Sequence, residues 1–241
     1  MKTAIVTGAS RGIGAATARL LARHGYAVVV NYSQNQKSAD KVVSDITEAG
    51  GEAIAVKADM AVESDILELF DVTYKKFGNI DVLVNNAAVN PSYEVEASDY
   101  AVMENLFRVN VFGVFIACRE AIKYMKKNRG GMIVNVSSES ARFGGNRMTH
   151  YAASKAAINT FSIGLAREVA PFNIRVNVVS PGVIDTDAHA KATPERLAAL
   201  KSSLPMGRMG KPEEVAETIA WLVSNEASYI SGSLLSVAGA R

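Results

Sequence analysis

The sequence predicts a single α/β domain built around a parallel sheet. Three observations carry this prediction. Short apolar runs alternate with amphipathic helical stretches along the whole chain, and the first run is followed at once by a glycine-rich turn and a helix. A chain of 241 residues that is 49% hydrophobic can bury one large core, and no linker or internal repeat divides it. We therefore expect residues 1–241 to fold as one unit.

The first strand, residues 4–6, leads into a turn with three glycines and then into a helix over residues 15–24. The spacing is Gly-x-x-x-Gly-x-Gly, which differs from the usual dinucleotide fingerprint Gly-x-Gly-x-x-Gly. Glycine permits positive φ and close backbone approach, and a helix N-terminus offers N–H groups to a phosphate. Three glycines also suit a plain tight turn, but the position after the first strand favours pyrophosphate binding. The residues expected to serve it are Gly8, Ser10, Arg11, Gly12, Ile13 and Gly14.

The second strand, residues 26–31, ends in Asn31, Tyr32 and Ser33, without the carboxylate that would accept from a ribose 2′-hydroxyl. Arg11 in the glycine turn can instead form paired hydrogen bonds to a 2′-phosphate. The alternative for Arg11 is a solvated loop residue. The combination predicts NADP(H) rather than NAD(H) as the cofactor.

The alternation continues with a helix over residues 37–49, a strand over 52–58, a helix over 62–77 and a strand over 80–84. Gly78 is the expected stop of the third helix. Asn85 and Asn86 follow the fourth strand directly. Their amides can bond the neighbouring backbone and a cofactor, although such residues in turns are usually structural.

A long helix is expected over residues 98–127, with Ser98 as its N-cap. Asn110 lies inside its apolar face, where an asparagine disfavours the helix and needs hydrogen-bond partners. It is either a packed polar residue or a kink that holds water near the site.

The stretch from Ser138 to Lys155 carries the candidate chemistry. Ser138 follows an apolar strand over residues 132–137, so its hydroxyl is expected at the edge where open α/β sheets bind ligands. Tyr151 and Lys155 are one helical turn apart, and a nearby cation favours the phenolate and lowers the phenol pKa. Such a tyrosine can exchange a proton with a carbonyl or an alcohol. Taken alone, the pair also fits a solvated surface contact.

The last third contains a strand over residues 173–180, closed by Pro181 and Gly182, and an irregular stretch over 183–204. The mixed polarity of that stretch suggests a flap over a ligand, with a short helix after Pro194. A helix from Pro212 to residue 224 and a strand over 233–237 complete the chain.

Charge and composition exclude several classes. A net charge of +2 gives no field for nucleic acid or a membrane surface, so small molecules are the expected partners. The single cysteine, Cys118, excludes an internal disulfide and suits the cytoplasm. The three histidines lack metal-ligand spacing, so no metal is expected. No apolar run looks long enough for a signal peptide or a membrane span.

Taken together, these motifs resemble the short-chain dehydrogenase/reductase family along the whole chain. The resemblance rests on Thr7-Gly8-x-x-x-Gly12-x-Gly14, Asp59, Asn85-Asn86-Ala87, Asn110, Ser138, Tyr151-x-x-x-Lys155 and Pro181-Gly182-x-x-x-Thr186. It implies a doubly wound Rossmann fold with a seven-stranded parallel sheet of order 3-2-1-4-5-6-7. It also implies a homotetramer.

The resemblance further implies a catalytic tetrad of Asn110, Ser138, Tyr151 and Lys155. In that family the tyrosine exchanges the proton, the serine holds the carbonyl oxygen, the lysine binds the nicotinamide ribose and lowers the phenol pKa, and the asparagine anchors a water. Further cofactor contacts are expected from Asp59, Met60, Asn86, Ala87, Ala88, Tyr151, Lys155, Pro181, Gly182, Ile184 and Thr186.

Two departures from the family pattern are present. Ala88 replaces a glycine that many members have, and residues 236–241 replace an acidic-glycine-glycine ending. The first should tighten the turn, and the second bears on a subunit contact.

The resemblance is nearest to 3-oxoacyl-carrier-protein reductases and bacterial glucose dehydrogenases. We expect ketone reduction, with 3-oxoacyl thioesters ahead of sugars. The mixture of apolar and charged residues in the flap suits an acyl chain: Ile184, Leu197, Leu200, Lys191 and Arg196. The cluster Lys123, Lys126, Lys127 and Arg129 is expected to cap its helix, or else to dock an acidic carrier. An NADP-binding sensor without turnover is the alternative of another class.

Overall fold

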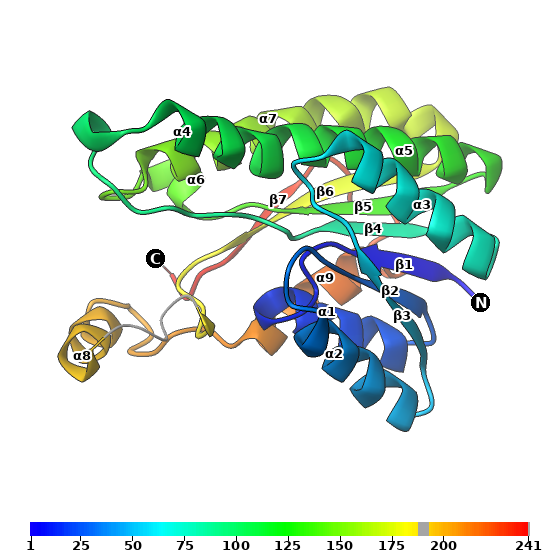
Figure 1. Cartoon of the computed structure of the whole chain (residues 1–241), viewed down its shortest axis with the longest axis horizontal. Coiled ribbons are helices and arrows are strands. Elements are labelled where there is room, and N and C mark those ends of the chain that lie inside the picture. Colours follow the sequence, from blue (N-terminus) through cyan, green and yellow to red (C-terminus); the bar gives the residue numbers. More distant parts are fainter. Residues whose placement is uncertain (188–192, 241) are drawn as a thin grey trace.

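Seven strands form one parallel sheet in the computed structural model, in the order β3-β2-β1-β4-β5-β6-β7 (Figure 1). The structure describes residues 1–187 and 193–240. The strands are β1 (Thr3–Val6), β2 (Ala27–Tyr32), β3 (Glu52–Lys57), β4 (Val82–Asn85), β5 (Gly131–Val136), β6 (Ile174–Pro181) and β7 (Leu234–Val237). The order and the parallel pairing confirm the predicted fold class.

Helices cover both faces of the sheet (Figure 1). One face carries α1 (Gly12–Arg23), α2 (Gln36–Glu48) and α9 (Pro212–Leu222). The other carries α3 (Glu63–Phe77), α5 (Gly113–Lys127) and α7 (Thr149–Val169). The shorter helices are α4 (Tyr100–Phe107), α6 (Ser140–Phe143), α8 (Pro194–Ser202) and the 3₁₀ turns η1 (Val95–Ala97) and η3 (Ala170–Phe172).

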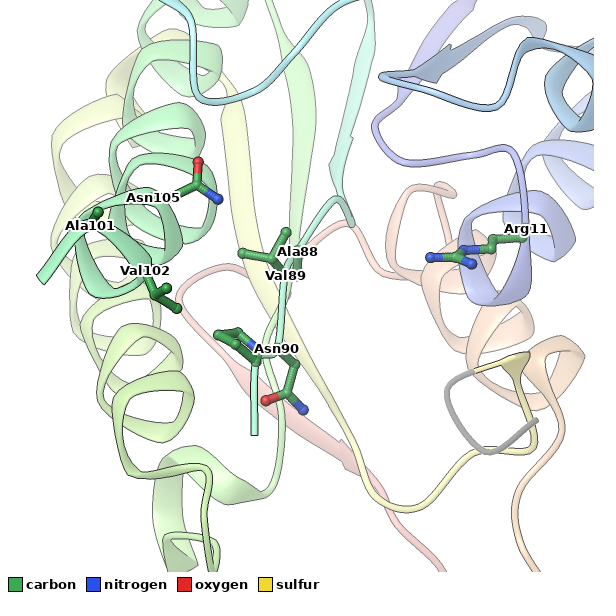
Figure 2. Close-up of a pocket in the computed structure, with 8 residues that line it drawn as sticks. Arg11, Ala88, Val89, Asn90, Ala101, Val102 and Asn105 are labelled. Atoms are coloured by element: carbon green, nitrogen blue, oxygen red, sulfur yellow. The ribbon is translucent and has the colours of Figure 1, made fainter. Parts of the chain in front are cut away.

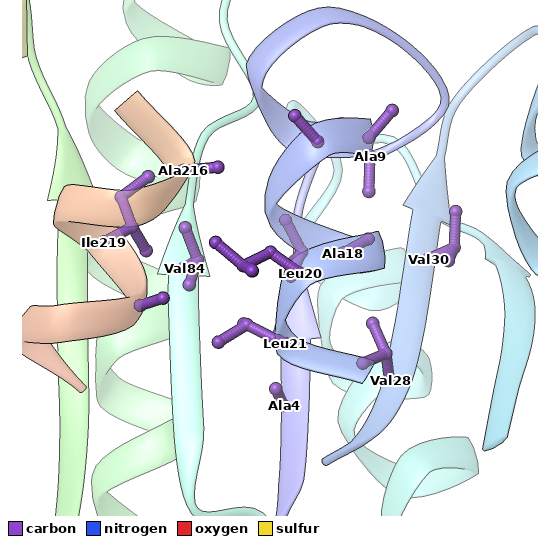
Figure 3. Close-up of a cluster of buried hydrophobic side chains, with 14 of the residues drawn as sticks. Ala4, Ala9, Ala18, Leu20, Leu21, Val28, Val30, Val84, Ala216 and Ile219 are labelled. Carbon is purple, nitrogen blue, oxygen red and sulfur yellow. The ribbon is translucent and has the colours of Figure 1, made fainter. Parts of the chain in front are cut away.

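The central strands are mostly apolar because both of their faces are covered. Ala4 and Val6 on β1 point to the layer of α1, whereas Ile5 points to the layer of α3 and α5. In Figure 3, Leu20 and Leu21 of α1 point toward Val84 of β4 and the side on which α9 carries Ile219. Because successive side chains of a strand point to opposite faces, the sheet contributes to two separate cores, one on each face.

The N-cap of α4 differs from the prediction. Asp99, not Ser98, caps this helix: its carboxylate accepts from the backbone N–H groups of Ala101 at 2.8 Å and Val102 at 3.3 Å. The Ser98 hydroxyl donates to the carbonyl of Val95 and lies 2.9 Å from Nε2 of His150. Ser98 is therefore committed to a tertiary contact that the sequence alone did not indicate.

The predicted single helix over residues 98–127 is also interrupted. A π-helical turn, Arg108–Phe112, separates α4 from α5, and the fully buried Asn110 lies at its centre. This turn brings Gly113 against the backbone of Met60, where a Cβ would collide with the Met60 carbonyl oxygen. The asparagine thus marks a change in helical geometry, which is common at functional sites.

The combined stretch Tyr100–Lys127 is long and apolar enough to cross a membrane by length and composition alone. This corrects the expectation that no segment would reach that length. Its buried side chains, including Ala117, Ala121 and Met125, belong to the core between the sheet and the helices α3, α5 and α7. Core helices of this kind pass the same test as membrane spans.

The sheet order reverses between β1 and β4. From β1 the chain moves outward to β2 and β3 on one side, then returns to place β4 and the later strands on the other. The loops after β1 and β4 therefore separate above the carboxyl ends of these strands and leave a crevice, where ligands bind in open α/β folds.

Candidate functional site

A cleft of about 670 Å³ opens at this crevice. Its walls come from the glycine turn, the ends of β2 and β3, the turn after β4 and the segment after β6. The predicted cofactor residues that line it are Gly8, Ser10, Arg11, Gly12, Asn31, Tyr32, Ser33, Asp59, Met60, Asn86, Ala87, Ala88 and Thr186. Those outside its lining are Ile13, Gly14, Tyr151, Lys155, Pro181, Gly182 and Ile184.

The glycine turn has the shape of a phosphate cradle. Gly8 and Gly12 adopt φ of 61° and 55°, which L side chains rarely adopt. A Cβ on Gly8 would lie 2.8 Å from Cα of Ala87, and one on Gly14 would lie 2.5 Å from Nδ2 of Asn86. Side chains at these positions would collide with the turn after β4 and with the glycine turn itself, so glycine keeps this backbone tight. The two positive-φ glycines and the free N–H groups at the N-terminus of α1 fit a dinucleotide pyrophosphate.

Two side-chain amides brace this turn, the buried Asn31 and the half-buried Asn86. Asn31 accepts from Gly8 N at 3.1 Å and donates to Ala58 O at 3.0 Å. Asn86 donates to Thr7 O at 2.9 Å and to Gly8 O at 3.1 Å. The side chain of Asn31 therefore bonds the backbone on both sides of the cleft floor, and the residue lines the cleft as predicted for a cofactor site.

Thr7 is a residue that the site prediction missed. Its Oγ1 accepts from the backbone N–H groups of Asn86 and Ala87, both at 3.0 Å. The hydroxyl thus joins the end of β1 to the turn after β4. A threonine directly before the first glycine was the available signal.

Arg11 is an exposed cation of the cleft. Its side chain is 74% exposed, and Nη1 lies 4.0 Å from Oδ2 of Asp187, which is also exposed. An ion pair with this geometry contributes little to stability, so Arg11 can exchange it for a bound anion at little cost. Tyr32 is 7% exposed and packs into the core, whereas Ser33 is exposed at the end of β2.

A second hollow of about 640 Å³ adjoins the cleft (Figure 2). In this view Arg11 lies on one side, and Val102 and Asn105 of α4 lie on the other. The segment Ala88, Val89, Asn90 and Pro91 completes the lining together with Ala101. The two spaces share Arg11, Ala88, Val89 and Asn105, so they adjoin along one wall.

Ser138 lies two residues beyond β5 and is held by Ser140. The Ser138 Oγ accepts from Ser140 N at 3.2 Å and from Ser140 Oγ at 2.9 Å. These contacts use acceptor positions of the Ser138 oxygen, so its own hydrogen can be donated to Tyr151. Ser140 was missed at the sequence level, although a serine hydroxyl such as that of Ser138 often accepts from the backbone N–H two residues further along the chain.

Lys155 is buried at 2% exposure beneath Tyr151. Its Nζ donates to Val136 O at 2.7 Å and lies 5.8 Å from the Tyr151 ring centroid. Burial lowers the pKa of Lys155 to about 8. The end of β5 therefore fixes the position of this ammonium.

The pKa of Tyr151 is raised, not lowered as predicted. Burial is the main cause, and the hydrogen bond with Ser138 acts in the opposite direction. Lys155 directs its ammonium to the Val136 carbonyl, so its charge does not outweigh the burial. The phenol of the free chain is therefore held in its protonated form, ready to donate.

Asn110 reaches the same region from the π-helical turn. Its Oδ1 accepts from Val89 N at 2.9 Å, and its Nδ2 donates to Val89 O at 2.9 Å and to Ser154 Oγ at 3.2 Å. Ser154 lies on α7 between Tyr151 and Lys155. The fold thus brings the four predicted tetrad positions together from β5, α7 and the π-helical turn.

The basic cluster lies at the opposite edge of the sheet, at the end of α5 (Figure 1). That edge is about 20 Å away, the length of β5. Lys123 pairs with Glu120, and Lys126 lies 3.7 Å from the centroid of the Phe172 ring. The structure thus gives these cations local partners and does not bring them to the cleft.

The predicted flap is described in part. Ile184 is buried and pairs with Gly210, while Leu197 and Leu200 are half-buried. Lys191 lies outside the described residues, as does the side chain of Arg196.

Lys155→Met is expected to change how stability depends on pH. Between about pH 8 and about pH 10.4 the unfolded chain keeps a lysine proton that the folded chain has released, so this group adds stability as pH rises. The free energy of unfolding of the wild type should therefore rise relative to that of Lys155→Met over this window. Urea unfolding at several pH values measures it, with the exposed Lys37→Met as control. Parallel curves for wild type and Lys155→Met would contradict the prediction.

Residues 8–239 match a protein family described as "Enoyl-(Acyl carrier protein) reductase". The chain is 45% identical to the "Uncharacterized oxidoreductase YgfF" of Escherichia coli K12, over 100% of both proteins. It is 39% identical to the "3beta-hydroxysteroid dehydrogenase 1" of Eggerthella lenta, over 99% of this chain and 92% of that one. It is also 39% identical to the "3-oxoacyl-[acyl-carrier-protein] reductase" of Synechocystis sp. PCC 6803, over 99% and 96%.

A solved structure has a similar fold over nearly the whole chain. It is a double mutant of a short-chain dehydrogenase/reductase from Serratia marcescens, with 38% identity and a TM-score of 0.93. The match covers 99% of this chain and 97% of that one. The similarity therefore includes the glycine turn, Ser138 and the Tyr151 helix.

Proposed function

This chain belongs to the short-chain dehydrogenase/reductase family, whose members are oxidoreductases that use NAD or NADP, and on that premise we propose that it is an NADP(H)-dependent carbonyl reductase. The observation that carries the proposal is the half-buried Tyr151 with Lys155 beneath it and Ser138 bonded to it. A binding module without turnover has no need of a phenol held protonated beside a hydroxyl donor.

Each residue of the tetrad has a role in this proposal. Bound nicotinamide dinucleotide supplies the hydride. The Ser138 hydroxyl, oriented by Ser140, donates to the substrate carbonyl oxygen, and Tyr151 gives that oxygen its proton. The ammonium of Lys155 stabilises the phenolate that remains, and Asn110 holds the π-helical turn against α7.

The glycine turn would hold the pyrophosphate, and Asp59 and Met60 at the end of β3 would contact the adenine. Tyr151 and Lys155 would meet the nicotinamide ribose, and Thr186 the carboxamide. Thr186 lies at the same cleft beside the glycine turn, since a Cβ on Gly12 would be 3.4 Å from its Cγ2. Pro181, Gly182 and Ile184 support the same wall: Gly182 N donates to Val237 O at 3.0 Å, which ties the wall to β7.

We expect NADPH to bind more tightly than NADH. Arg11 is exposed and lines the same cleft as Ser33. A hydrogen-bonded arginine–phosphate contact is worth ~1.5–3 kcal/mol, roughly ten- to a hundredfold in affinity. Titration of both cofactors measures the ratio. Arg11→Ala should reduce it, while Arg23→Ala at the other end of α1 should not. Ser33→Asp should move the preference toward NADH, and equal affinities in the wild type would contradict the proposal.

The proposed direction is reduction of a ketone, with 3-oxoacyl thioesters ahead of aldose sugars. A relative named for 3-oxoacyl-carrier-protein reduction and the acyl-carrier description of the family support this order. The relative named as a hydroxysteroid dehydrogenase supports a second substrate class, in which the carbonyl or secondary alcohol sits on an apolar skeleton. The half-buried Leu197 and Leu200 of α8 suit either apolar substrate.

The test pairs acetoacetyl thioester plus NADPH against glucose plus NADP, with NADPH absorbance as the readout. Ketone reduction without glucose oxidation is the expected result. Glucose oxidation alone would establish the sugar dehydrogenase alternative. Tight NADPH binding without turnover on any activated ketone would establish the sensor alternative.

We propose a cytoplasmic homotetramer. Phe112 is 52% exposed, and Phe115 of α5 stacks on Phe161 of α7 at 3.9 Å between ring centroids. Exposed apolar helix faces of this kind are commonly buried in closed symmetric assemblies. Light scattering should report four copies, and a monomer of 25.7 kDa would contradict the proposal. The single buried thiol, Cys118, suits a reducing compartment.

A further inference from the structure

Ser154 lies between two of the tetrad residues and is itself fully buried on α7. Its hydroxyl donates to the backbone carbonyl of Tyr151 at 2.7 Å and accepts from Nδ2 of Asn110 at 3.2 Å. An amide nitrogen only donates, so the serine oxygen must accept there and its hydrogen must go to Tyr151 O. The hydroxyl of Ser154 is therefore engaged both as a donor and as an acceptor.

The amide of Asn110 is equally committed. Both hydrogens of Nδ2 have acceptors, one at Val89 O and one at Ser154 Oγ, and Oδ1 accepts from Val89 N. The side chain therefore acts as a strut between the segment after β4 and α7. Its hydrogen-bonding capacity toward a ligand is largely used within the protein.

We propose that Ser154 is a positioning residue, which ties the π-helical turn through Asn110 to the backbone of Tyr151. This inference rests on the proposed reductase function and adds a residue to it. The path runs from Val89 at the cleft through Asn110 and Ser154 to Tyr151, and each link is a hydrogen bond. Loss of the hydroxyl leaves Nδ2 of Asn110 short of an acceptor in the protein interior.

The chain offers a matched control further along the same helix. Ser162 is also buried, donates to Ile158 O at 2.7 Å and accepts from Nδ2 of Asn135 at 2.8 Å. The contacts have the same chemistry, but this residue lies two helical turns further from Tyr151. Ser154→Ala and Ser162→Ala should therefore lower thermal stability to a similar extent, and only the first should affect turnover.

The expected result for Ser154→Ala is a kcat about tenfold to a hundredfold lower with KM nearly unchanged, because misplacing a reacting group by a fraction of an ångström is costly. Ser162→Ala should keep the wild-type kcat. A double-mutant cycle with Asn110→Ala then tests the path: Ser154→Ala should have little further effect once the asparagine is gone. Equal kcat in the two serine variants, or an undiminished effect in the Asn110→Ala background, would overturn the proposal.

Hydrogen exchange at the amide of Val89 gives a readout that does not need turnover. This N–H donates to Oδ1 of Asn110. It should exchange faster in Ser154→Ala and at the wild-type rate in Ser162→Ala. If the wild type reduces no ketone, the reductase assignment fails, and this measurement still decides the role of Ser154: unchanged exchange in Ser154→Ala overturns it.

Discussion

Tyr151→Phe is expected to remove nearly all turnover while the fold and NADPH binding are kept. The substitution deletes only the hydroxyl that burial holds protonated, and general acid–base catalysis is worth ~10²–10⁴-fold in rate. Steady-state ketone reduction gives kcat, and cofactor fluorescence gives the affinity for NADPH.

Tyr124→Phe is the matched control. Its hydroxyl contacts Asp71 at 3.0 Å on the outside of α3 and α5, remote from Ser138. This variant should turn over as the wild type does. A Tyr151→Phe enzyme with more than about a tenth of the wild-type rate would mean that the proton comes from another group.

Ser138→Ala is expected to lower kcat by ~10²–10³-fold, the usual loss when one donor to a developing oxyanion is removed. Ser140 donates to the oxygen of Ser138, so the Ser138 hydroxyl keeps its own hydrogen to donate, to Tyr151 in the free chain and to the carbonyl oxygen of a bound ketone. Ser138→Thr keeps a hydroxyl and should recover part of the rate. Steady-state kinetics on the same ketone measures all variants.

Ser140→Ala separates orientation from donation. It leaves the Ser138 hydroxyl in place but removes one of its two donors, since the backbone N–H at 140 remains. Its loss should therefore be smaller than that of Ser138→Ala. An equal or larger loss for Ser140→Ala would assign the donating role to Ser140 instead.

Element boundaries were predictable wherever local signals agreed with packing. Gly78 ends α3 in the left-handed conformation that the sequence indicated, and Pro212 begins α9. The predicted N-cap of α4, Ser98, was wrong because Ser98 and Asp99 are both good cap residues. A contact with His150, 52 residues away in the chain, decided between them.

The predicted lowering of the Tyr151 pKa was wrong for a similar reason. Helical spacing places an ammonium near a phenol, but it does not say how deeply both are buried or where the ammonium points. The carbonyl of Val136, which accepts from the Lys155 ammonium, belongs to β5. The burial that raises the Tyr151 pKa likewise results from how distant parts of the chain pack around the phenol.

Features that depend on neighbours in the chain could be predicted without coordinates: the alternation of strands and helices, the positive-φ glycines of the phosphate cradle and the one-turn spacing of Tyr151 and Lys155. They follow from backbone sterics and from helical and strand periodicity. The partners of buried polar groups depend instead on long-range packing. Asn110 meets Ser154 across 44 residues and Asn31 meets Gly8 across 23, because a buried amide must bond whatever the fold brings beside it.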